Sequence, residues 1–364
     1  MTVIRTLRRP RVLIVGCGDV GLRCAKRLRG RARVFALTRE PQHLAALRAA
    51  GTVPLVGDLD ARRTLARLAG LAPTVLHLAP PAPTGDDDRR TQALIAALSA
   101  RRRSPALGPR PTSVALRADL RADSHADSHA DSRRSRRLIS GPRPHSALHG
   151  GAPAIVPDGA RAAGGAKRRR LRVVYASTTG VYGDCGGARI DETRPTRAAT
   201  PRAKRRVAAE RRLRRATARG VLAATIARIP GIYAADRLPL ARLEKRTPAL
   251  VEADDVYTSH IHADDLAAII VRLATHGRPS RVIHASDDSE LRMADYFDRV
   301  ADAFALARVP RMSRAQAERE LDPLVLSFMR ESRRLSNRRL KHELRVRLRY
   351  PGVDDFLRTL PPPA

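Results

Sequence analysis

Tryptophan is absent from the 364 residues, aromatic residues make up 3%, and cysteine occurs three times. With so few aromatic rings to stack bases, the chain is not typical of a dedicated single-strand nucleic-acid binder. The odd number of cysteines, without metal-ligand spacing at Cys17, Cys24 and Cys185, indicates reduced thiols and a cytoplasmic protein. No apolar run approaches ~18 residues, so the sequence predicts no membrane span.

Positive charge is what the chain has in excess, with a formal net charge of +34. Residues 101–170 hold 16 Arg or Lys against five Asp, and the remainder still carries +23. Such a surplus permits non-specific binding to polyanions, a partner class that we keep as an alternative to a small-molecule substrate. The many Arg–Ala neighbours are equally typical of GC-rich coding bias.

Apolar strand signals and amphipathic helix signals alternate over the first hundred residues. Continuous apolar runs predict strands at 11–18, 32–39, 52–59 and 74–79. Amphipathic segments between and after them predict helices at 20–28, 42–51, 61–70 and 90–102. Asp60 is the expected N-cap of the third helix. This alternation predicts parallel strand–helix–strand units with both faces of the sheet covered.

The alternation stops at residues 103–170, which are rich in Arg, Ser, Pro, Gly and Ala and contain the repeat ADSHADSHADS (122–132). His125 and His129 are residues that could bind a metal, but a solvated low-complexity repeat is the favoured interpretation. So long a stretch without a pattern predicts a disordered basic insertion rather than part of the fold. Strand and helix signals resume at LRVVYASTTGVYGD (171–184).

The segment VLIVGCGDVGLRCAKRL places Gly16, Gly18 and Gly21 between a predicted strand and a predicted helix. In that context the first glycine permits a tight turn, the second lets the backbone approach a pyrophosphate, and the third lets helix and strand pack closely. The pyrophosphate then lies at the helix N-terminus. The motif predicts a dinucleotide site, and a purely structural glycine turn is the alternative.

The ends of the next two strands bear on which dinucleotide is bound. An acidic residue after the second strand would accept hydrogen bonds from the ribose 2′-hydroxyl of NAD, but Thr38 and Arg39 stand there. An arginine pairs with a 2′-phosphate, so the sequence favours NADP, while Glu40 keeps NAD open. Asp58, at the end of the third strand, is expected near the adenine, with a helix cap as the alternative.

Several motifs occur in the order seen in one known family: GDL (57–59), VLHLAPP (75–81), ASTTGVYGD (176–184), ARIPGIY (227–233) and SHIHADDLAAII (259–270). With them the chain resembles the extended short-chain dehydrogenases/reductases, the NAD-dependent epimerase/dehydratase family. The resemblance covers nearly the whole chain outside 103–170. It implies an α/β fold with a Rossmann-type doubly wound parallel sheet and a small C-terminal substrate-binding region.

On this resemblance, residues 1–102 and 171–286 form the Rossmann domain, and residues 287–364 together with 234–256 form the substrate-binding region. The cofactor-binding residues that it implies are Gly16, Gly18, Asp19, Val20, Gly21, Arg39, Asp58, Leu59, Leu78, Ala79 and Pro230. Family members mostly act on nucleotide sugars. They often dimerise through a pair of helices, so a homodimer through helix 201–219 stays open, although its arginines would repel one another.

The resemblance also implies a hydride transfer assisted by a Ser or Thr, a Tyr and a Lys around the reacting oxygen. Thr178 matches the hydroxyl, with Ser177 as the alternative. The tyrosine and lysine, expected as YxxxK, are absent: counting back from Glu210 places Arg206 at the lysine and Arg202 at the tyrosine. An arginine cannot act as a general acid near neutral pH, although it can neutralise an oxyanion.

The sequence therefore predicts an atypical NADP(H)-dependent oxidoreductase or epimerase/dehydratase-like enzyme, with a catalytically silent NADP(H)-binding sensor or partner subunit as the alternative. One further pattern, His260-x-His262-x-Asp264-Asp265, resembles a metal site. Asp264 and Asp265 are expected instead to cap the helix that follows, so no metal site is predicted.

Overall fold

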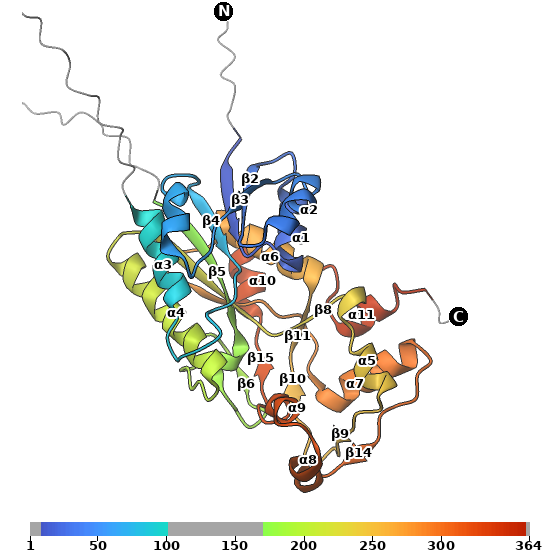
Figure 1. The fold of residues 1–364 in the computed structure, drawn as a ribbon. Coiled ribbons are helices and arrows are strands. Elements are labelled where there is room, and N and C mark those ends of the chain that lie inside the picture. Colours follow the sequence, from blue (N-terminus) through green and yellow to red (C-terminus); the bar gives the residue numbers. More distant parts are fainter. Residues whose placement is uncertain (1–8, 101–169, 362–364) are drawn as a thin grey trace, which may run out of the picture. The chain divides into compact units, whose positions relative to one another are not determined.

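A parallel sheet runs through the structure (Figure 1). It has seven strands in the order β12-β7-β5-β4-β1-β2-β3. The chain is seen here in a computed structural model that describes residues 9–100 and 170–361. The predicted insertion and its repeat, at 101–169, lie outside the described residues. The strands are β1 (Arg11–Val15), β2 (Arg33–Thr38), β3 (Val53–Val56), β4 (Thr74–His77), β5 (Arg172–Thr178), β7 (Ala223–Ile229) and β12 (Val282–His284).

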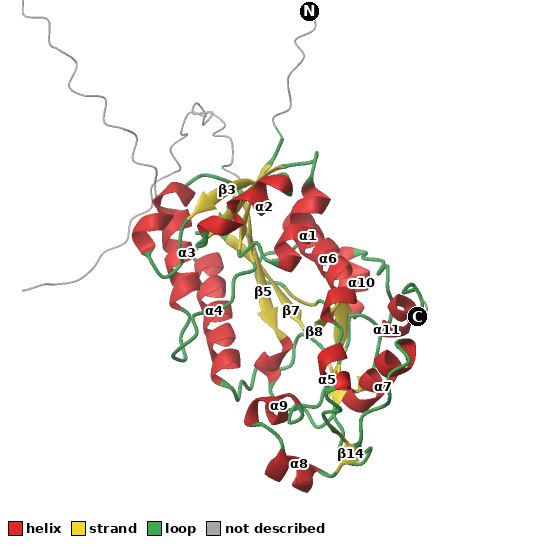
Figure 2. Ribbon diagram, turned by 45° about the vertical axis from the view of Figure 1, so that its right-hand side comes forward, coloured by secondary structure: helices red, strands yellow, loops and turns green. Residues whose placement is uncertain are grey.

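Helices pack on both faces of this sheet (Figure 2). One face is covered by α1 (Asp19–Leu28), α6 (Ala263–His276) and α10 (Arg338–Leu344). The other is covered by α3 (Arg89–Ser99) and α4 (Pro201–Ala218), and α2 (Leu44–Ala49) lies beside β3. The predicted fold class, a Rossmann-type doubly wound parallel sheet, is confirmed.

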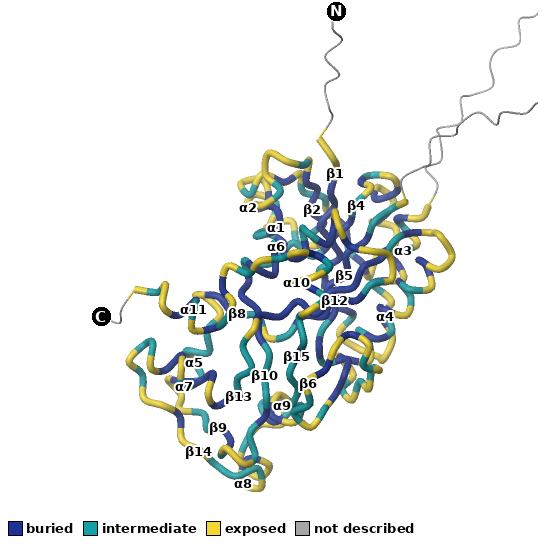
Figure 3. The backbone as a smooth tube through the Cα atoms, turned by 180° about the vertical axis from the view of Figure 1, so that it is seen from behind, coloured by how far each residue is buried: buried dark blue, intermediate teal, exposed yellow. Residues whose placement is uncertain are grey.

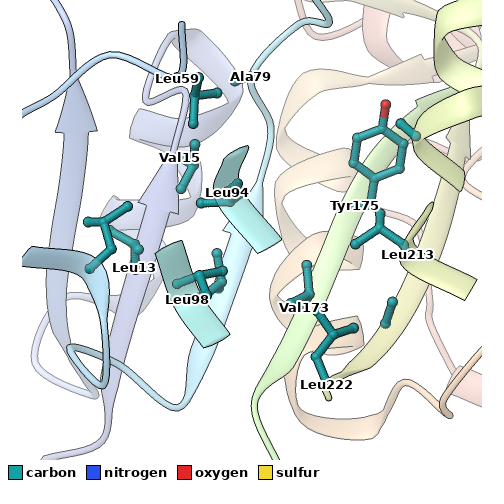
Figure 4. Packing of buried hydrophobic residues seen from close by; sticks show 14 of the residues in the cluster. Leu13, Val15, Leu59, Ala79, Leu94, Leu98, Val173, Tyr175, Leu213 and Leu222 are labelled. Atoms are coloured by element: carbon teal, nitrogen blue, oxygen red, sulfur yellow. The ribbon is translucent and has the colours of Figure 1, made fainter. Parts of the chain in front are cut away.

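Alternate residues of each strand supply two separate hydrophobic layers because successive side chains point to opposite faces. Leu13 and Val15 of β1 pack in one cluster with Leu94 and Leu98 of α3 (Figure 4). Val12 and Ile14 belong to the other cluster, against α1 and α6. Burying one such side chain stabilises the fold by about 1.5–3 kcal/mol, which is why the strands are apolar throughout.

A third hydrophobic cluster gathers the C-terminal elements, and buried residues otherwise concentrate on the central strands (Figure 3). Its helices are α5 (Leu240–Glu244), α7 (Met293–Ala303), α8 (Arg314–Glu320), α9 (Pro323–Phe328) and α11 (Val353–Leu357). Two-stranded pairings accompany them: β8 (Gly231–Tyr233) with β11 (His260–His262), β9 (Ala249–Leu250) with β14 (Arg311–Met312), β10 (Tyr257–Thr258) with β13 (Leu291–Arg292), and β6 (Arg189–Ile190) with β15 (Arg334–Leu335). The exact domain boundaries stay a prediction.

Two capping predictions were wrong. The segment predicted as helix 61–70 is a 3₁₀ helix, Arg62–Leu68, preceded by Ala61, and the Asp60 carboxylate pairs with Arg90 at 2.5 Å instead of capping it. At α6 the N-cap is His262, whose Nδ1 accepts from the backbone N–H of Asp264 at 3.2 Å. Asp265 accepts from the backbone N–H groups of Arg349 and Tyr350. In each case the carboxylate interacts with a residue that is distant in the sequence instead of capping its own helix.

No described helix combines the length and the apolarity that crossing a bilayer requires. The three cysteines are free thiols. Burial raises the pKa of Cys17 to about 11 and that of Cys24 to about 12. These two thiols are therefore protonated near neutral pH and are poor nucleophiles.

Candidate active site

The glycine turn between β1 and α1 has no room for a side chain at its first glycine and little room for one at its third. Gly16 has a φ of +85°, and a Cβ there would lie 2.4 Å from the backbone nitrogen of Ala79. A Cβ on Gly21 would lie 3.1 Å from the carbonyl oxygen of Gly16. By contrast, a Cβ on Gly18 would have no described heavy atom within 4 Å. The turn is tight on its inner side and open at Gly18.

A first cavity of about 430 Å³ opens where β1, β2 and β3 end. The strand order reverses between β1 and β4, which is where doubly wound folds bind ligands. Seven of the predicted cofactor residues line this first cavity: Gly16, Gly18, Asp19, Arg39, Asp58, Leu59 and Ala79. The other four do not: Val20, Gly21 and Leu78 are outside its lining, and Pro230 lines a second cavity.

Two arginines contribute positive charge to the first cavity. The Arg39 side chain is 60% exposed and its Nε lies 3.3 Å from a carboxylate oxygen of Glu40. Arg90, from the start of α3, bonds both carboxylate oxygens of Asp60 and the carbonyl oxygen of Pro80. The sequence did not predict Arg90 as a site residue, because no local pattern indicates that it pairs with Asp60, 30 residues earlier.

The second cavity, of about 580 Å³, lies at the end of β5 and reaches into the C-terminal elements. Three of the four predicted catalytic residues line it: Thr178, Arg202 and Arg206. The C-terminal residues that line it include His260, Tyr296, Arg242, Glu331 and Arg333. The second cavity therefore joins the end of a sheet strand to the predicted substrate-binding region, whose sequence gave no pattern for Arg242, Tyr296, Glu331 or Arg333.

The two neighbouring hydroxyls at the end of β5 differ in their surroundings. Ser177 is buried, and its Oγ donates to Glu210 at 2.6 Å. Glu210 is itself fully buried and paired with Arg228. Within the described part of the chain, the Oγ1 of Thr178 accepts one hydrogen bond, from the backbone N–H of Gly180 at 3.3 Å, and Thr178 lines the second cavity. Thr178 is thus the hydroxyl placed to meet a ligand.

Arg206 of α4 reaches back to the end of β5. Its Nη1 donates to the carbonyl oxygen of Ala176 at 2.5 Å and to the Tyr175 hydroxyl at 3.2 Å. Arg202, one helical turn earlier, lies over the Phe328 ring at 5.8 Å. Neither guanidinium has a carboxylate within 4.0 Å among the described residues.

Arg242 adds a third such guanidinium to the second cavity. Its Nη2 donates to the carbonyl oxygen of Pro248 at 2.9 Å, and its guanidinium lies 4.6 Å from the Phe297 ring centroid. Its Nε is buried and has no hydrogen-bond partner among the described residues. Burial lowers the pKa of Arg242. Since Glu331 is already paired with Arg333 at 2.8 Å, the described lining of the second cavity is cationic overall.

Comparisons with known proteins agree with the doubly wound fold and its two cavities. The model of the NAD-dependent epimerase/dehydratase family matches residues 159–285, and a TrkA-N domain model matches residues 12–126. The resemblance predicted from the motifs, to the extended short-chain dehydrogenases/reductases and this family in particular, is confirmed. No curated protein matches the chain.

Solved structures with a similar fold cover almost the whole chain. A conserved protein of unknown function from Silicibacter pomeroyi is 23% identical with a TM-score of 0.66, covering 96% of this chain and 97% of its own. MoeE5 in complex with UDP-glucose and NAD is 17% identical with a TM-score of 0.61, covering 96% of each chain. A nucleoside-diphosphate-sugar epimerase from Pseudomonas aeruginosa is 14% identical with a TM-score of 0.63, covering 96% and 95%. At these identities the likeness supports the fold.

Proposed function

We propose that the protein is an NAD(P)-dependent oxidoreductase or epimerase/dehydratase-like enzyme that acts on a hydroxyl or carbonyl group of an anionic small molecule, such as a nucleotide sugar. The observation that carries this proposal is the pair of cavities at the ends of the sheet strands. The first is built around Gly16 and Gly18, and the second around Thr178. The family match and the nucleotide-sugar ligand of MoeE5 support the same reaction class.

The first cavity has the features that a dinucleotide needs. The open side of Gly18 and the N-terminus of α1 would receive the pyrophosphate. Asp19, in the first turn of α1, is paired with Arg23 at 2.7 Å and Arg237 at 3.5 Å, so its charge is compensated there. Arg39 would contact a ribose 2′-phosphate, which favours NADP over NAD. When bound, the dinucleotide supplies or accepts a hydride.

In the second cavity Thr178 would orient the reacting oxygen of the substrate by a hydrogen bond. The positive guanidinium of Arg206 would stabilise negative charge that develops on that oxygen. The Ser177 hydroxyl donates a hydrogen bond to Glu210 and would hold the end of β5 in place rather than contact the substrate. These assignments give each of the four predicted residues except Arg202 a distinct task.

Arg202 and Arg242 would bind the anionic part of the substrate. The Arg242 guanidinium is partly buried without a carboxylate among the described residues, which is costly, and its unsatisfied Nε makes the cost greater. Arg202 is exposed and adds positive charge to the same cavity. A phosphate or diphosphate would supply the missing charge-assisted hydrogen bonds. The described contacts of this cavity therefore favour a phosphorylated substrate over a neutral one.

The test measures binding first and turnover second. NADPH and NADH are titrated by the fluorescence of their nicotinamide, and nucleoside-diphosphate sugars, sugar phosphates and uncharged sugars are then assayed for absorbance change with the dinucleotide. We expect tight dinucleotide binding and turnover of the anionic compounds. Thr178→Val should lower kcat by roughly 100-fold or more with the dinucleotide Kd unchanged. The control is Thr275→Val, at an exposed site at the end of α6.

Two outcomes would contradict the proposal. Dinucleotide binding without turnover of any compound would favour the catalytically silent sensor or partner subunit. Failure to bind either dinucleotide would reject the enzyme and the sensor together.

A further inference from the structure

The second cavity lacks the usual proton-transfer group of its family, because Arg202 occupies the tyrosine position. Four other lining residues in the described part of the chain can in principle exchange a proton with a substrate: Tyr257, His260, Tyr296 and Glu331. Their surroundings differ enough to choose among them. The choice depends on which of them lies beside Thr178, since the reacting oxygen must contact both groups.

Glu331 lies at the Thr178 turn. An ideal Cβ on Gly180 would be 3.8 Å from a Glu331 carboxylate oxygen and 3.8 Å from the Thr178 hydroxyl oxygen. Both oxygens therefore lie close to the Gly180 turn on the wall of the second cavity. Gly180 has no side chain that would separate them.

The carboxylate of Glu331 is also held in a defined place. Its side chain is 17% exposed, and an oxygen lies 2.8 Å from Nη1 of Arg333. The same Nη1 donates to the carbonyl oxygen of Gly183 at 3.0 Å. Since Gly183 follows the Thr178 turn directly, Arg333 ties the carboxylate to the loop that carries the hydroxyl.

The other three candidates are less suitable. His260 and Tyr296 stack with ring centroids 4.3 Å apart. Burial lowers the pKa of His260 to about 4 and raises the pKa of Tyr296. Two guanidiniums lie near the Tyr257 ring, Arg334 at 4.8 Å and Arg292 at 5.6 Å from its centroid. Among the described contacts of these three residues, none is with Thr178.

We propose that Glu331 is the general base of the reaction and takes the proton-transfer role that the tyrosine has in the family; this rests on the proposed function. In the oxidative direction the Glu331 carboxylate takes the proton of the substrate hydroxyl, and the O–H electron pair becomes the second bond of the carbonyl. The hydrogen on the same carbon leaves with its electron pair as hydride, for which the oxidised nicotinamide dinucleotide is the acceptor. In reduction the protonated Glu331 returns the proton.

The first variant, Glu331→Gln, keeps the shape and removes the ability to take a proton. We expect kcat for oxidation to fall by about 10²–10⁴-fold. Calorimetry should show the substrate binding as tightly as before, with the dinucleotide Kd within about twofold. The acid limb of the pH profile of kcat/KM should disappear. Glu318→Gln, at an exposed site paired with Arg330, is the matched control and should behave as the wild type.

Two further variants separate chemistry from structure. Glu331→Ala should recover part of its rate when formate is added, because a small carboxylate can occupy the vacated place. Gly180→Ala should fold normally, since its methyl meets both neighbours at ordinary contact distance, but should raise KM and lower kcat by placing a methyl group beside the two oxygens.

The assignment is overturned if Glu331→Gln turns over at the wild-type rate. It is equally overturned if Glu331→Gln loses substrate binding and formate restores nothing to Glu331→Ala, because the role is then structural. In both cases the wild type turns over and the proposed function stands. If the wild type turns over nothing, the proposed function and this base are rejected together.

Discussion

Arg228 of β7 donates hydrogen bonds to both carboxylate oxygens of Glu210 on α4, at 3.1 and 2.7 Å, and both side chains are buried. Glu210 is the residue from which the positions of Arg206 and Arg202 are counted. Another of its partners, Ser177, lies next to Thr178 at the end of β5. One ion pair thus joins the helix that carries the two arginines to the strands beneath the second cavity.

Glu210→Ala should lower the free energy of unfolding by about 3–5 kcal/mol, because it leaves the Arg228 charge buried without a partner. Urea denaturation followed by circular dichroism measures this loss. The double variant Glu210→Leu with Arg228→Met removes both charges and should recover most of the stability. A loss below about 1 kcal/mol in the single variant would show that the pair is not a structural element.

Gly16→Ala should abolish dinucleotide binding and destabilise the fold, because its Cβ would collide with the backbone of Ala79. Gly30→Ala is a close control: its φ is +76°, but its Cβ would have no described heavy atom within 4 Å. The control should cost about 1 kcal/mol from the left-handed backbone alone and should bind the dinucleotide normally. Thermal unfolding and NADPH fluorescence separate the two. Equal losses in both variants would mean that the close approach at Ala79 is unimportant.

Arg39→Ala should raise the Kd of NADPH by roughly 10- to 100-fold, since a hydrogen bond to a charged group contributes about 1.5–3 kcal/mol. The Kd of NADH should change by less than about twofold. The exposed Arg31→Ala, outside the first cavity, controls for lost surface charge. If the wild type prefers NADH, or if the variant loses both dinucleotides equally, the predicted preference for NADP is wrong.

Asp287 should make the protein less stable as pH rises from about 4 to about 7. Burial raises its pKa to about 7 in the folded state, from 3.8, against the opposing hydrogen bonds of Ser289. Between these values the folded state holds a proton that the unfolded state has released, so the free energy of unfolding falls with pH. Asp287→Asn should flatten this fall, while the exposed neighbour Asp288→Asn should keep it. Chemical denaturation at pH 5, 6 and 7 provides the measurement, and an unchanged slope in Asp287→Asn contradicts the assignment.

Some expectations from the sequence remain predictions. These are the preference for NADP, the cytoplasmic location, the homodimer, polyanion binding by the basic insertion, and the domain boundaries. The catalytic and cofactor roles of the named residues also await the variants described above.

Local patterns along the chain were enough to predict the sheet, the glycine turn and the helix whose Arg202 and Arg206 line the second cavity. Each depends on near neighbours: a run of apolar residues, a turn that only glycine permits, and a count along one helix. Gly16, Arg39 and Asp58 could be assigned to one site on the same basis, because each follows a parallel strand and such strands end at one edge of a sheet.

The partners of the charged and hydroxyl groups, in contrast, follow from the packing of the whole fold. Ser177 differs from Thr178 because it is buried against Glu210, and Asp60 and Asp265 bind Arg90 and the backbone near Tyr350. Packing also brings Arg242 and Glu331 to the second cavity from segments without a motif. A side chain's partner across many residues depends on how the elements meet in space, and neither spacing nor propensity encodes that arrangement.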